Sequence, residues 1–244
     1  MRRLLDQLAG RGAGPWDVPV APERPIAVIG DVHGCDDLLA RMLGWLGREA
    51  PDHRPVLVGD LIDRGEDSAG VLRRVMGRSE VVAIKGNHEA MCLAFLDQPE
   101  AQGPQWLRNG GLQTLASFGV RLPGADPEEI REAALRLRAA MGDAMVAWLR
   151  DRPLWWRSGN VAAVHAGADP RRPLEEQEEE VLLWQRPHRG ERARTDGVWI
   201  VHGHTIVDEP EVQGGRVNVD TGAFATGVLT ALLMAPGAAR FVQT

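Results

Sequence analysis

The chain has 244 residues, of which 44% are hydrophobic and 25% charged, as in an ordinary globular protein with a substantial core. Its 28 basic and 34 acidic side chains leave a net charge of −6, so we expect no binding to nucleic acid or to anionic membranes by bulk attraction. With two cysteines, no signal-peptide pattern and no apolar stretch long enough to span a bilayer, the sequence favours a cytoplasmic protein without disulfides.

Residues 1–24 are rich in glycine, proline and arginine and are expected to form an N-terminal arm. Residues 25–244 are predicted to form one domain. Within that domain, residues 99–153 have helical spacing and contain no candidate metal ligand. We expect them to be a helical insertion that influences substrate choice. Gly142 would divide its second half into two helices.

Three apolar runs in the first part of the chain each end at a glycine that is followed by polar side chains. They are residues 26–29, 56–58 and 81–84. Runs of this length and composition predict buried strands, and helical spacing follows each of them in residues 35–48, 68–76 and 90–96. Since right-handed crossovers lay successive strands parallel, the polar residues after the runs should meet at one edge of a sheet.

The polar residues at this edge are Asp31, His33, Asp60 and Asn87. Asp31 and His33 are one residue apart, so in an extended segment both side chains would point the same way and could bind one cation. Carboxylate, imidazole and amide groups together suit Mn, Fe or Zn. The sequence therefore predicts a metal site here.

The second half of the chain adds histidines after two further strand-like runs, residues 161–164 and 198–202. His165 follows the first run and His204 the second, whereas His202 is interpreted as a hydrogen-bonded strand residue. Residues 216–220 and 228–234 are predicted to be late strands joined by a turn at residues 221–223. The acidic run at residues 175–180 is interpreted as a solvated helix face.

Five motifs together carry a resemblance to a known family. They are Gly30-Asp31-Val32-His33-Gly34, Gly59-Asp60-Leu61-Ile62-Asp63-Arg64-Gly65, Gly86-Asn87-His88-Glu89, His165-Ala166-Gly167 and Gly203-His204-Thr205. This series resembles the calcineurin-like metallophosphoesterases and, within them, the bacterial serine/threonine phosphoprotein phosphatases. The resemblance implies an α/β fold, a four-layer sandwich of two mixed β-sheets flanked by helices, with a dinuclear metal centre at the sheet edge.

The resemblance also implies a role for each matching position. One divalent cation would be held by Asp31, His33 and His204, the other by Asn87 and His165, with Asp60 as the bridge. His88 would donate a proton, Asp63 would orient it, and Arg64 and Arg186 would bind phosphate. The two cations are expected to be Mn²⁺, with Fe or Zn as alternatives.

These roles are chemically reasonable. Two cations about 3.5–4 Å apart can share a hydroxide that attacks phosphorus in line. A histidine held by a carboxylate can protonate the leaving alkoxide, and a guanidinium matches phosphate geometry. Asp63 and Arg64 could instead belong to an ordinary turn, Arg186 could be a surface residue, and Glu89 could be favoured only by the helix dipole.

The function expected from the sequence is metal-dependent hydrolysis of phosphomonoesters, with a phosphoserine or phosphothreonine protein as substrate. Asp63, Glu89 and Thr205 differ from the residues usual in diadenosine tetraphosphate hydrolases and favour this reading. The alternatives are a bis(5'-nucleosyl)-tetraphosphatase, another hydrolase of small phosphoesters, and a catalytically silent metal-binding interaction protein. Residues 105–111 could lie near the active-site mouth or could simply be a helix broken by two glycines.

Overall fold

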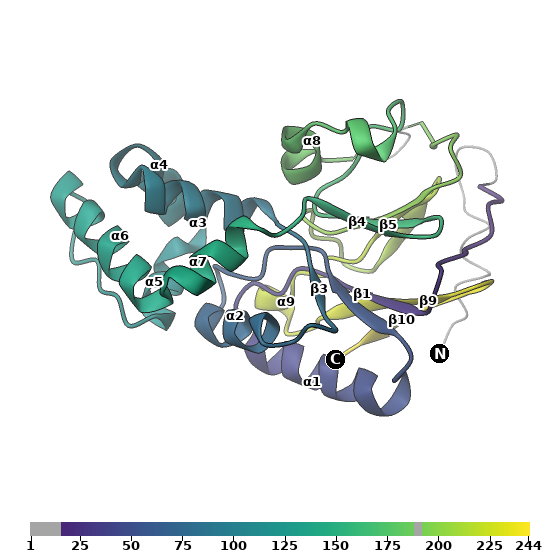
Figure 1. Cartoon of the computed structure of the whole chain (residues 1–244), viewed down its shortest axis with the longest axis horizontal. Helices are drawn as coiled ribbons and strands as arrows, with labels where there is room; N and C mark the ends of the chain where they lie inside the picture. The colour runs from purple at the N-terminus through teal and green to yellow at the C-terminus, as the bar shows by residue number, and fades with distance from the viewer. Residues whose placement is uncertain (1–15, 188–191) are drawn as a thin grey trace.

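Two mixed sheets of five strands pack face to face between helices in the computed structural model, which describes residues 16–187 and 192–244. Helices α1 and α2 cover the outer face of the first sheet and α8 lies beyond the second, so the layers run helix, sheet, sheet, helix (Figure 1). The four-layer α/β sandwich expected from the sequence is confirmed.

The first sheet has the strand order β10-β9-β1-β2-β3. Strands β1, β2 and β3 are parallel, and β9 runs antiparallel to both β1 and β10. Their bounds are β1 Ile26–Ile29, β2 Arg54–Leu57, β3 Val82–Ala83, β9 Thr230–Ala235 and β10 Ala238–Gln243. The parallel arrangement places the chain segments after β1, β2 and β3 at one edge of the sheet, as predicted.

The second sheet has the strand order β4-β5-β6-β8-β7. Strands β5, β6 and β8 are parallel, and β4 and β7 are antiparallel edge strands. Their bounds are β4 Trp155–Ser158, β5 Val161–Val164, β6 Trp199–His202, β7 Glu211–Gln213 and β8 Arg216–Asn218. The loops after β5 and β6 carry His165 and His204 to the same region of the molecule as the loops of the first sheet.

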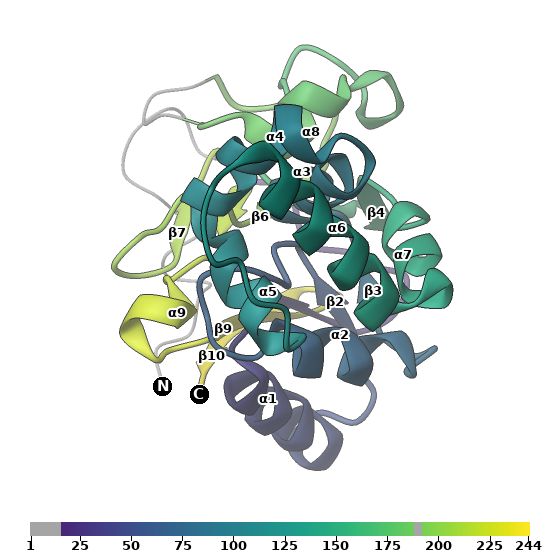
Figure 2. The ribbon, with the colours of Figure 1, turned by 90° about the vertical axis from the view of Figure 1, so that its left-hand side faces the viewer.

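Helices α1 Asp36–Glu49, α2 Ser68–Met76 and α3 Asn87–Asp97 follow the first three strands, close to the predicted bounds. The insertion forms α4 Pro99–Trp106, a π-helix Leu107–Gly111, α5 Leu112–Ser117, α6 Pro127–Met141 and α7 Asp143–Arg150. Gly142 separates α6 from α7, as expected, with a φ of 74°. Together with α3, these helices form a group at one end of the sheets (Figure 2).

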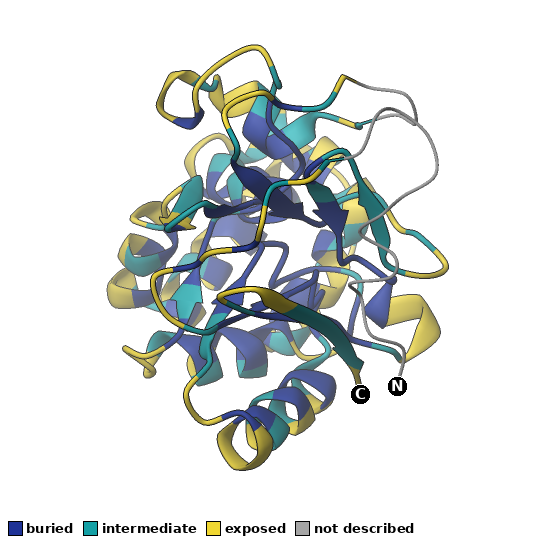
Figure 3. Ribbon diagram, turned by 90° about the vertical axis from the view of Figure 1, so that its right-hand side faces the viewer, coloured by how far each residue is buried: buried dark blue, intermediate teal, exposed yellow. Residues whose placement is uncertain are grey.

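Strand β1 shows why the apolar runs are continuous. Ile26 and Val28 face the second sheet, whereas Ala27 and Ile29 face the helices. All four are buried. A parallel strand covered on both faces needs apolar side chains at successive positions rather than at alternate ones. Figure 3 shows the resulting buried layers inside an exposed outer shell.

The two late strands predicted at the chain end are present as β8 and β9. They lie in different sheets, β8 in the second and β9 in the first, so residues 221–223 belong to a crossing between the sheets. The crossing between the sheets contains the short helix α9, Ala223–Thr226. Strands β4, β7 and β10 were not predicted, since none of them is an apolar run buried on both faces and their sequences lack that signal.

The acidic run was also interpreted wrongly. Residues 175–180 are not one helix face, because a 3₁₀-helix, Leu174–Glu176, ends before α8, Glu179–Trp184, begins. Gln177 lies between them, and its side chain bonds the backbone at Asp169. The acidic side chains of the run are nevertheless exposed, as a solvated interpretation requires.

Residues 16–24, the described part of the predicted arm, run across the end of the second sheet. Trp16 packs edge-on against Trp199, and Trp199 Nε1 donates to the Val18 carbonyl. Gly237 N donates to the carbonyl of buried Val20, so the segment touches both sheets. The boundary at residue 25 stays a prediction. None of the described helices has the length and apolar character needed to cross a bilayer.

Candidate active site

Most of the candidate metal ligands come together where the two sheets meet, whereas Asp31 is in neither of the groups described next and contacts the site through the backbone N–H of His204. Two groups of potential ligand atoms, each within 4.8 Å of one another, share Asp60. One group adds His33 and His88, and the other adds His165 and His204. Asp60 Oδ2 lies 3.5 Å from His33 Nε2, and Oδ1 lies 3.4 Å from His165 Nε2. The two oxygens of one buried carboxylate therefore face the two groups, as a bridging ligand requires.

Backbone carbonyls set the tautomers of two of these histidines. His33 Nδ1 lies 2.8 Å from the Ile62 carbonyl and His165 Nδ1 lies 3.0 Å from the Val58 carbonyl. A carbonyl can only accept, so each Nδ1 carries hydrogen and each Nε2 presents a lone pair to the centre. Burial lowers the pKa of His33 to about 3 and the pKa of His204 to about 4. Both are then neutral at pH 7, the form that binds metal.

Several polar atoms at the centre have no hydrogen-bond partner among the described residues. Asp31 Oδ1, His33 Nε2 and His204 Nε2 are all buried and without a hydrogen bond. In addition, His204 Nδ1 lies 3.1 Å from Asn87 Oδ1 and 3.2 Å from His165 Nε2, two groups that both point electron pairs inward. Buried polar atoms are normally satisfied, and converging lone pairs repel unless a proton or cation lies among them. The donor set therefore fits divalent cations.

Buried negative charge supports the same conclusion. Burial, with Asp220 and Asp60 nearby, raises the pKa of Asp31 well above its usual value. Burial and Asp60 raise the pKa of Glu89 to about 7. Burial also raises the pKa of Asp220 to about 6. So many carboxyl groups in one dry site are costly unless cations neutralise them.

We expect Asp31→Asn to raise the melting temperature of the metal-free protein, because it removes one of the crowded carboxylates. The amide oxygen can still accept from His204 N, which donates to Asp31 Oδ2 at 3.0 Å. The same variant should gain less stability than the wild type when Mn²⁺ is added. Thermal unfolding with and without Mn²⁺ measures both effects. A lower melting temperature for the metal-free variant would contradict this account of the site.

The backbone at His33 corrects one expectation. Its φ is 44°, so the segment after β1 is a turn and not an extended strand. The alternating geometry that was predicted to align Asp31 with His33 is therefore wrong. His33 reaches the centre because the N–H groups of Val32 and His33 both donate to the Asp60 carbonyl, which folds the first loop over the second.

His204 also lies differently from what we expected. The family resemblance implies that His204 shares a cation with Asp31 and His33. Its imidazole lies instead beside Asn87 and His165, and only its backbone N–H reaches Asp31. The geometry therefore favours His204 as a member of the Asn87 and His165 group. His202 Nδ1 lies 3.0 Å from the Gly203 carbonyl, outside both groups, as predicted.

Two glycines in the motifs serve close packing of the loops. A Cβ at Gly86 would overlap the Asp60 carboxylate, and a Cβ at Gly203 would overlap Asp31 Oδ1. Neither glycine has a positive φ, so the constraint is space and not backbone conformation. At these two positions glycine lets one ligand loop approach the carboxylate of another.

Glu89 has a role that the sequence interpretation missed. It is completely buried, and its carboxylate accepts from the backbone N–H groups of Gly86 at 2.8 Å, Asp60 at 2.9 Å and Leu61 at 2.8 Å. The helix dipole alone therefore does not explain this residue. Glu89 ties the loop after β2 to the start of α3, which brings Asp60 and Asn87 together. The spacing of a capping box, a glutamate three residues after the N-cap, was the available signal.

We expect Glu89→Gln to weaken Mn²⁺ binding about 10–100-fold, because outer partners of metal ligands contribute on that scale. A glutamine presents only one acceptor oxygen to several backbone donors, so Asp60 would lose its fixed position. Calorimetric Mn²⁺ titration measures the change. Glu66→Gln, at an exposed position, is the matched control. Equal Mn²⁺ affinity in the two variants would exclude this role.

His88 and Asp63 form a buried pair beside the metal groups. His88 Nδ1 lies 2.7 Å from Asp63 Oδ2, and His88 Nε2 points toward the centre, 3.8 Å from Asp60 Oδ2. Burial alone would lower the pKa of His88, but Asp60 and Asp63 outweigh it and raise this pKa above its usual value. A histidine in this state can hold and deliver a proton.

The two candidate phosphate ligands differ in how they are held. Arg64 is half-buried, its guanidinium lies 5.0 Å from the ring centre of Phe224, and its charge reaches both His33 and His88. Arg186 is exposed in the segment after α8, close enough to lower the pKa of His204. Both border the centre. Sequence reasoning did not find Phe224, which lies in α9 and also contacts the His33 ring.

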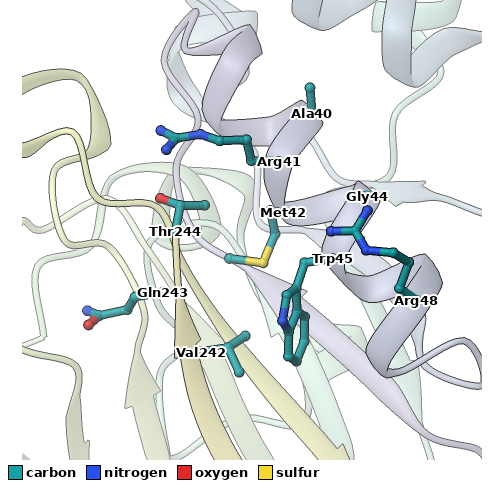
Figure 4. Close-up of a pocket in the computed structure, with 9 residues that line it drawn as sticks. All are labelled: Ala40, Arg41, Met42, Gly44, Trp45, Arg48, Val242, Gln243 and Thr244. Carbon is teal, nitrogen blue, oxygen red and sulfur yellow. The ribbon is translucent and has the colours of Figure 1, made fainter.

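A separate pocket of about 440 Å³ lies between α1 and β10 and contains none of these residues. It is lined mainly by apolar groups, including Met42, Trp45 and Val242, with Arg41 and Arg48 beside them (Figure 4). It has no cluster of potential metal ligands. The chemistry of the described chain is concentrated at the sheet edge.

Comparison with known proteins agrees with this geometry. The family model "Calcineurin-like phosphoesterase" matches residues 24–228. The chain is 30% identical over 230 residues to the bis(5'-nucleosyl)-tetraphosphatase PrpE [asymmetrical] of Bacillus velezensis, covering 83% of this chain and 86% of that protein. It is 26% identical over 232 residues to serine/threonine-protein phosphatase 2 of Salmonella typhimurium, covering 85% and 91%.

Solved structures share the fold. A putative diadenosine tetraphosphatase superimposes with a TM-score of 0.64 at 20% identity, over 95% of this chain and 96% of the other. A serine/threonine phosphatase from Saccharomyces cerevisiae superimposes with a TM-score of 0.57 at 16% identity, over 91% and 80%. The matched residues, 24–228, include every candidate ligand described above. The chain belongs to the calcineurin-like phosphoesterase family and is a hydrolase.

Proposed function

We propose that this hydrolase cleaves phosphomonoesters of alcohols, with phosphoserine or phosphothreonine in proteins as the substrate. The observation that carries the proposal is the buried His88–Asp63 pair. An alkoxide is a strongly basic leaving group and departs slowly unless it is protonated. A histidine oriented by a carboxylate beside the metal groups is placed to supply that proton.

The metal set supporting this proposal has two parts. One cation would be held by Asp31, His33 and Asp60, and the other by Asp60, Asn87, His165 and His204. Mn²⁺ is our proposed occupant of both, since mixed oxygen and nitrogen ligands suit it. When bound, such cations supply Lewis acidity toward water and toward phosphoryl oxygens.

The remaining steps belong to side chains of this chain. Arg64, supported by Phe224, would bind the phosphoryl oxygens and orient the ester for in-line attack. Arg186, which lies near His204, would add a second contact. His88 Nε2 would then donate its proton to the departing alcohol oxygen, while Asp63 holds Nδ1–H and fixes the direction of the ring.

A second candidate is cleavage of dinucleoside tetraphosphates. It is favoured by the relative that is 30% identical and is named a bis(5'-nucleosyl)-tetraphosphatase. In that reaction the leaving group is itself a phosphate, which is a weaker base than an alkoxide and has less need of a proton donor. The His88–Asp63 pair therefore supports the monoester more strongly than the tetraphosphate.

The test is a comparison of kcat/KM on a phosphothreonine peptide and on diadenosine tetraphosphate. Metal is first removed by chelation and Mn²⁺ is then restored. We expect the peptide to be the better substrate and both activities to depend on Mn²⁺. A preference for diadenosine tetraphosphate would replace the first proposal with the second. No turnover of either substrate would contradict both.

A further inference from the structure

Asp63 is held by the helical insertion rather than by its own loop. Trp106 Nε1, at the end of α4, donates to Asp63 Oδ2 at 2.9 Å. Thr114 Oγ1, in α5, donates to Asp63 Oδ1 at 2.6 Å. With His88 on Oδ2, the carboxylate thus has a donor from the insertion on each oxygen.

The backbone of Asp63 is held by Thr114 of the insertion together with Ser68 of α2. The Asp63 backbone nitrogen donates to both Thr114 Oγ1 and Ser68 Oγ at 3.0 Å. The oxygen atoms of these two hydroxyl groups are 2.9 Å apart. Asp63, Ser68, Trp106 and Thr114 are all completely buried. Asp63 also has a φ of 71°, an unusual conformation for a residue with a side chain. Tertiary contacts are needed to hold such a residue in place.

Arg64, the next residue, also forms a hydrogen bond with the insertion. Arg64 has a φ of 68°, and its N–H donates to the Gly110 carbonyl at 3.3 Å. Gly110 lies in the π-helix with a φ of 107°, and a Cβ there would meet the Arg64 backbone. The break at the two glycines therefore lets the insertion approach Arg64 closely.

We propose that Trp106 and Thr114 are positioning residues that aim the Asp63–His88 pair at the leaving group. This inference deepens the proposed function and rests on it. The insertion would then do more than influence substrate choice: its first half would complete the proton-donating machinery. The segment at residues 105–111 would be both a broken helix and a part of the active site.

Core packing alone does not account for the contacts. The Trp106 ring stacks on Phe95 with 4.6 Å between ring centres, and a phenylalanine could fill much of the same space. The indole N–H is a separate feature, directed at a carboxylate that already accepts from His88. In the same way, a valine could replace Thr114 in shape but could not donate to Asp63 Oδ1.

The test uses Trp106→Phe and Thr114→Val in the full chain. Each removes the donated hydrogen and keeps most of the side-chain volume. Trp148→Phe is the control for the first, because Trp148 is a half-buried tryptophan of α7 that lies under Arg152. Ser117→Ala is the control for the second, because the Ser117 hydroxyl lies in the same helix as Thr114 and bonds Ala69 N and the Thr114 carbonyl but not the Asp63 carboxylate.

Kinetics are measured on a phosphothreonine peptide and on p-nitrophenyl phosphate, whose leaving group departs readily without a proton. For both test variants we expect kcat on the peptide to fall about 10–100-fold, the factor that corresponds to loss of one hydrogen bond to a charged group. The fall on p-nitrophenyl phosphate should be much smaller. KM and Mn²⁺ affinity should stay within about twofold of the wild type, and the controls should match the wild type throughout.

A second readout needs neither metal nor turnover. In the metal-free protein, the low-field NMR resonance of His88 Nδ1–H reports its bond to Asp63. We expect it to shift in both test variants and to stay in place in both controls. An unchanged resonance, or an unchanged kcat on the peptide, would overturn the inference. If the resonance shifts and kcat falls equally on both substrates, Trp106 and Thr114 do position the Asp63–His88 pair. The proposed role of His88 as proton donor would then be wrong.

Discussion

Asp60→Asn is expected to lower kcat by about 10³-fold or more and to weaken the binding of two Mn²⁺ ions at once. Asp60 is the residue shared by both groups of potential ligands, and its two oxygens face opposite histidines. Asparagine keeps one acceptor oxygen but replaces the other with an N–H₂ group, which cannot bind a cation. The negative charge between the two positions is lost as well.

Turnover of p-nitrophenyl phosphate and calorimetric Mn²⁺ titration measure these two losses. Asp67→Asn is the matched control, because Asp67 is an exposed N-cap of α2 and asparagine caps helices about equally well. The wild-type protein should take up two ions, and the Asp60 variant fewer and more weakly. Two tightly bound ions in Asp60→Asn would remove the bridging role from this residue.

His88→Asn should lower kcat on a phosphothreonine peptide by about 10²–10⁴-fold, the range expected for loss of a general acid. On p-nitrophenyl phosphate the same variant should lose far less, since that leaving group needs no proton. Burial would lower the pKa of His88, but Asp60 and Asp63 outweigh it and raise this pKa, which favours the protonated imidazole, whereas an amide cannot donate in this way.

The selectivity between the two substrates is what distinguishes proton donation from general damage. Mn²⁺ affinity should change little, because His88 is not one of the proposed ligands and its Nδ1 is held by Asp63. His53→Asn, at a half-exposed position after α1, is a suitable control. Equal losses on both substrates would indicate that His88 acts in metal binding or folding instead.

The candidate ligands in the first half of the chain could be predicted from the sequence because each of them follows a continuous apolar strand. Such runs occur where a parallel strand is covered on both faces, and parallel strands end at one edge. By that argument Asp31, Asp60 and Asn87 were expected at one edge, and they lie there in contact with His204 or His165; their roles as ligands stay a prediction. His33 was placed correctly for the wrong reason, since alternation along an extended segment does not apply at a φ of 44°.

The supporting residues could not be found in this way. Trp106 and Thr114 are 43 and 51 positions from Asp63 in the chain, and nothing in their own segment marks them as its donors. Phe224 reaches Arg64 only because α9 lies at the crossing between the two sheets. Periodicity reports which face of an element is buried, but it does not say which other element lies against that face.

The amino-acid sequence by itself determined the family of this protein, the strands that carry the ligands and the candidate ligand set, because these depend on local patterns and motifs. Only the tertiary structure showed that the His204 imidazole lies beside Asn87 and His165, and that Glu89 binds backbone N–H groups of two loops. It also showed that helices of the insertion donate hydrogen bonds to Asp63. Those features are contacts between segments far apart in the chain, and their geometry is set by packing of the whole fold rather than by any single stretch.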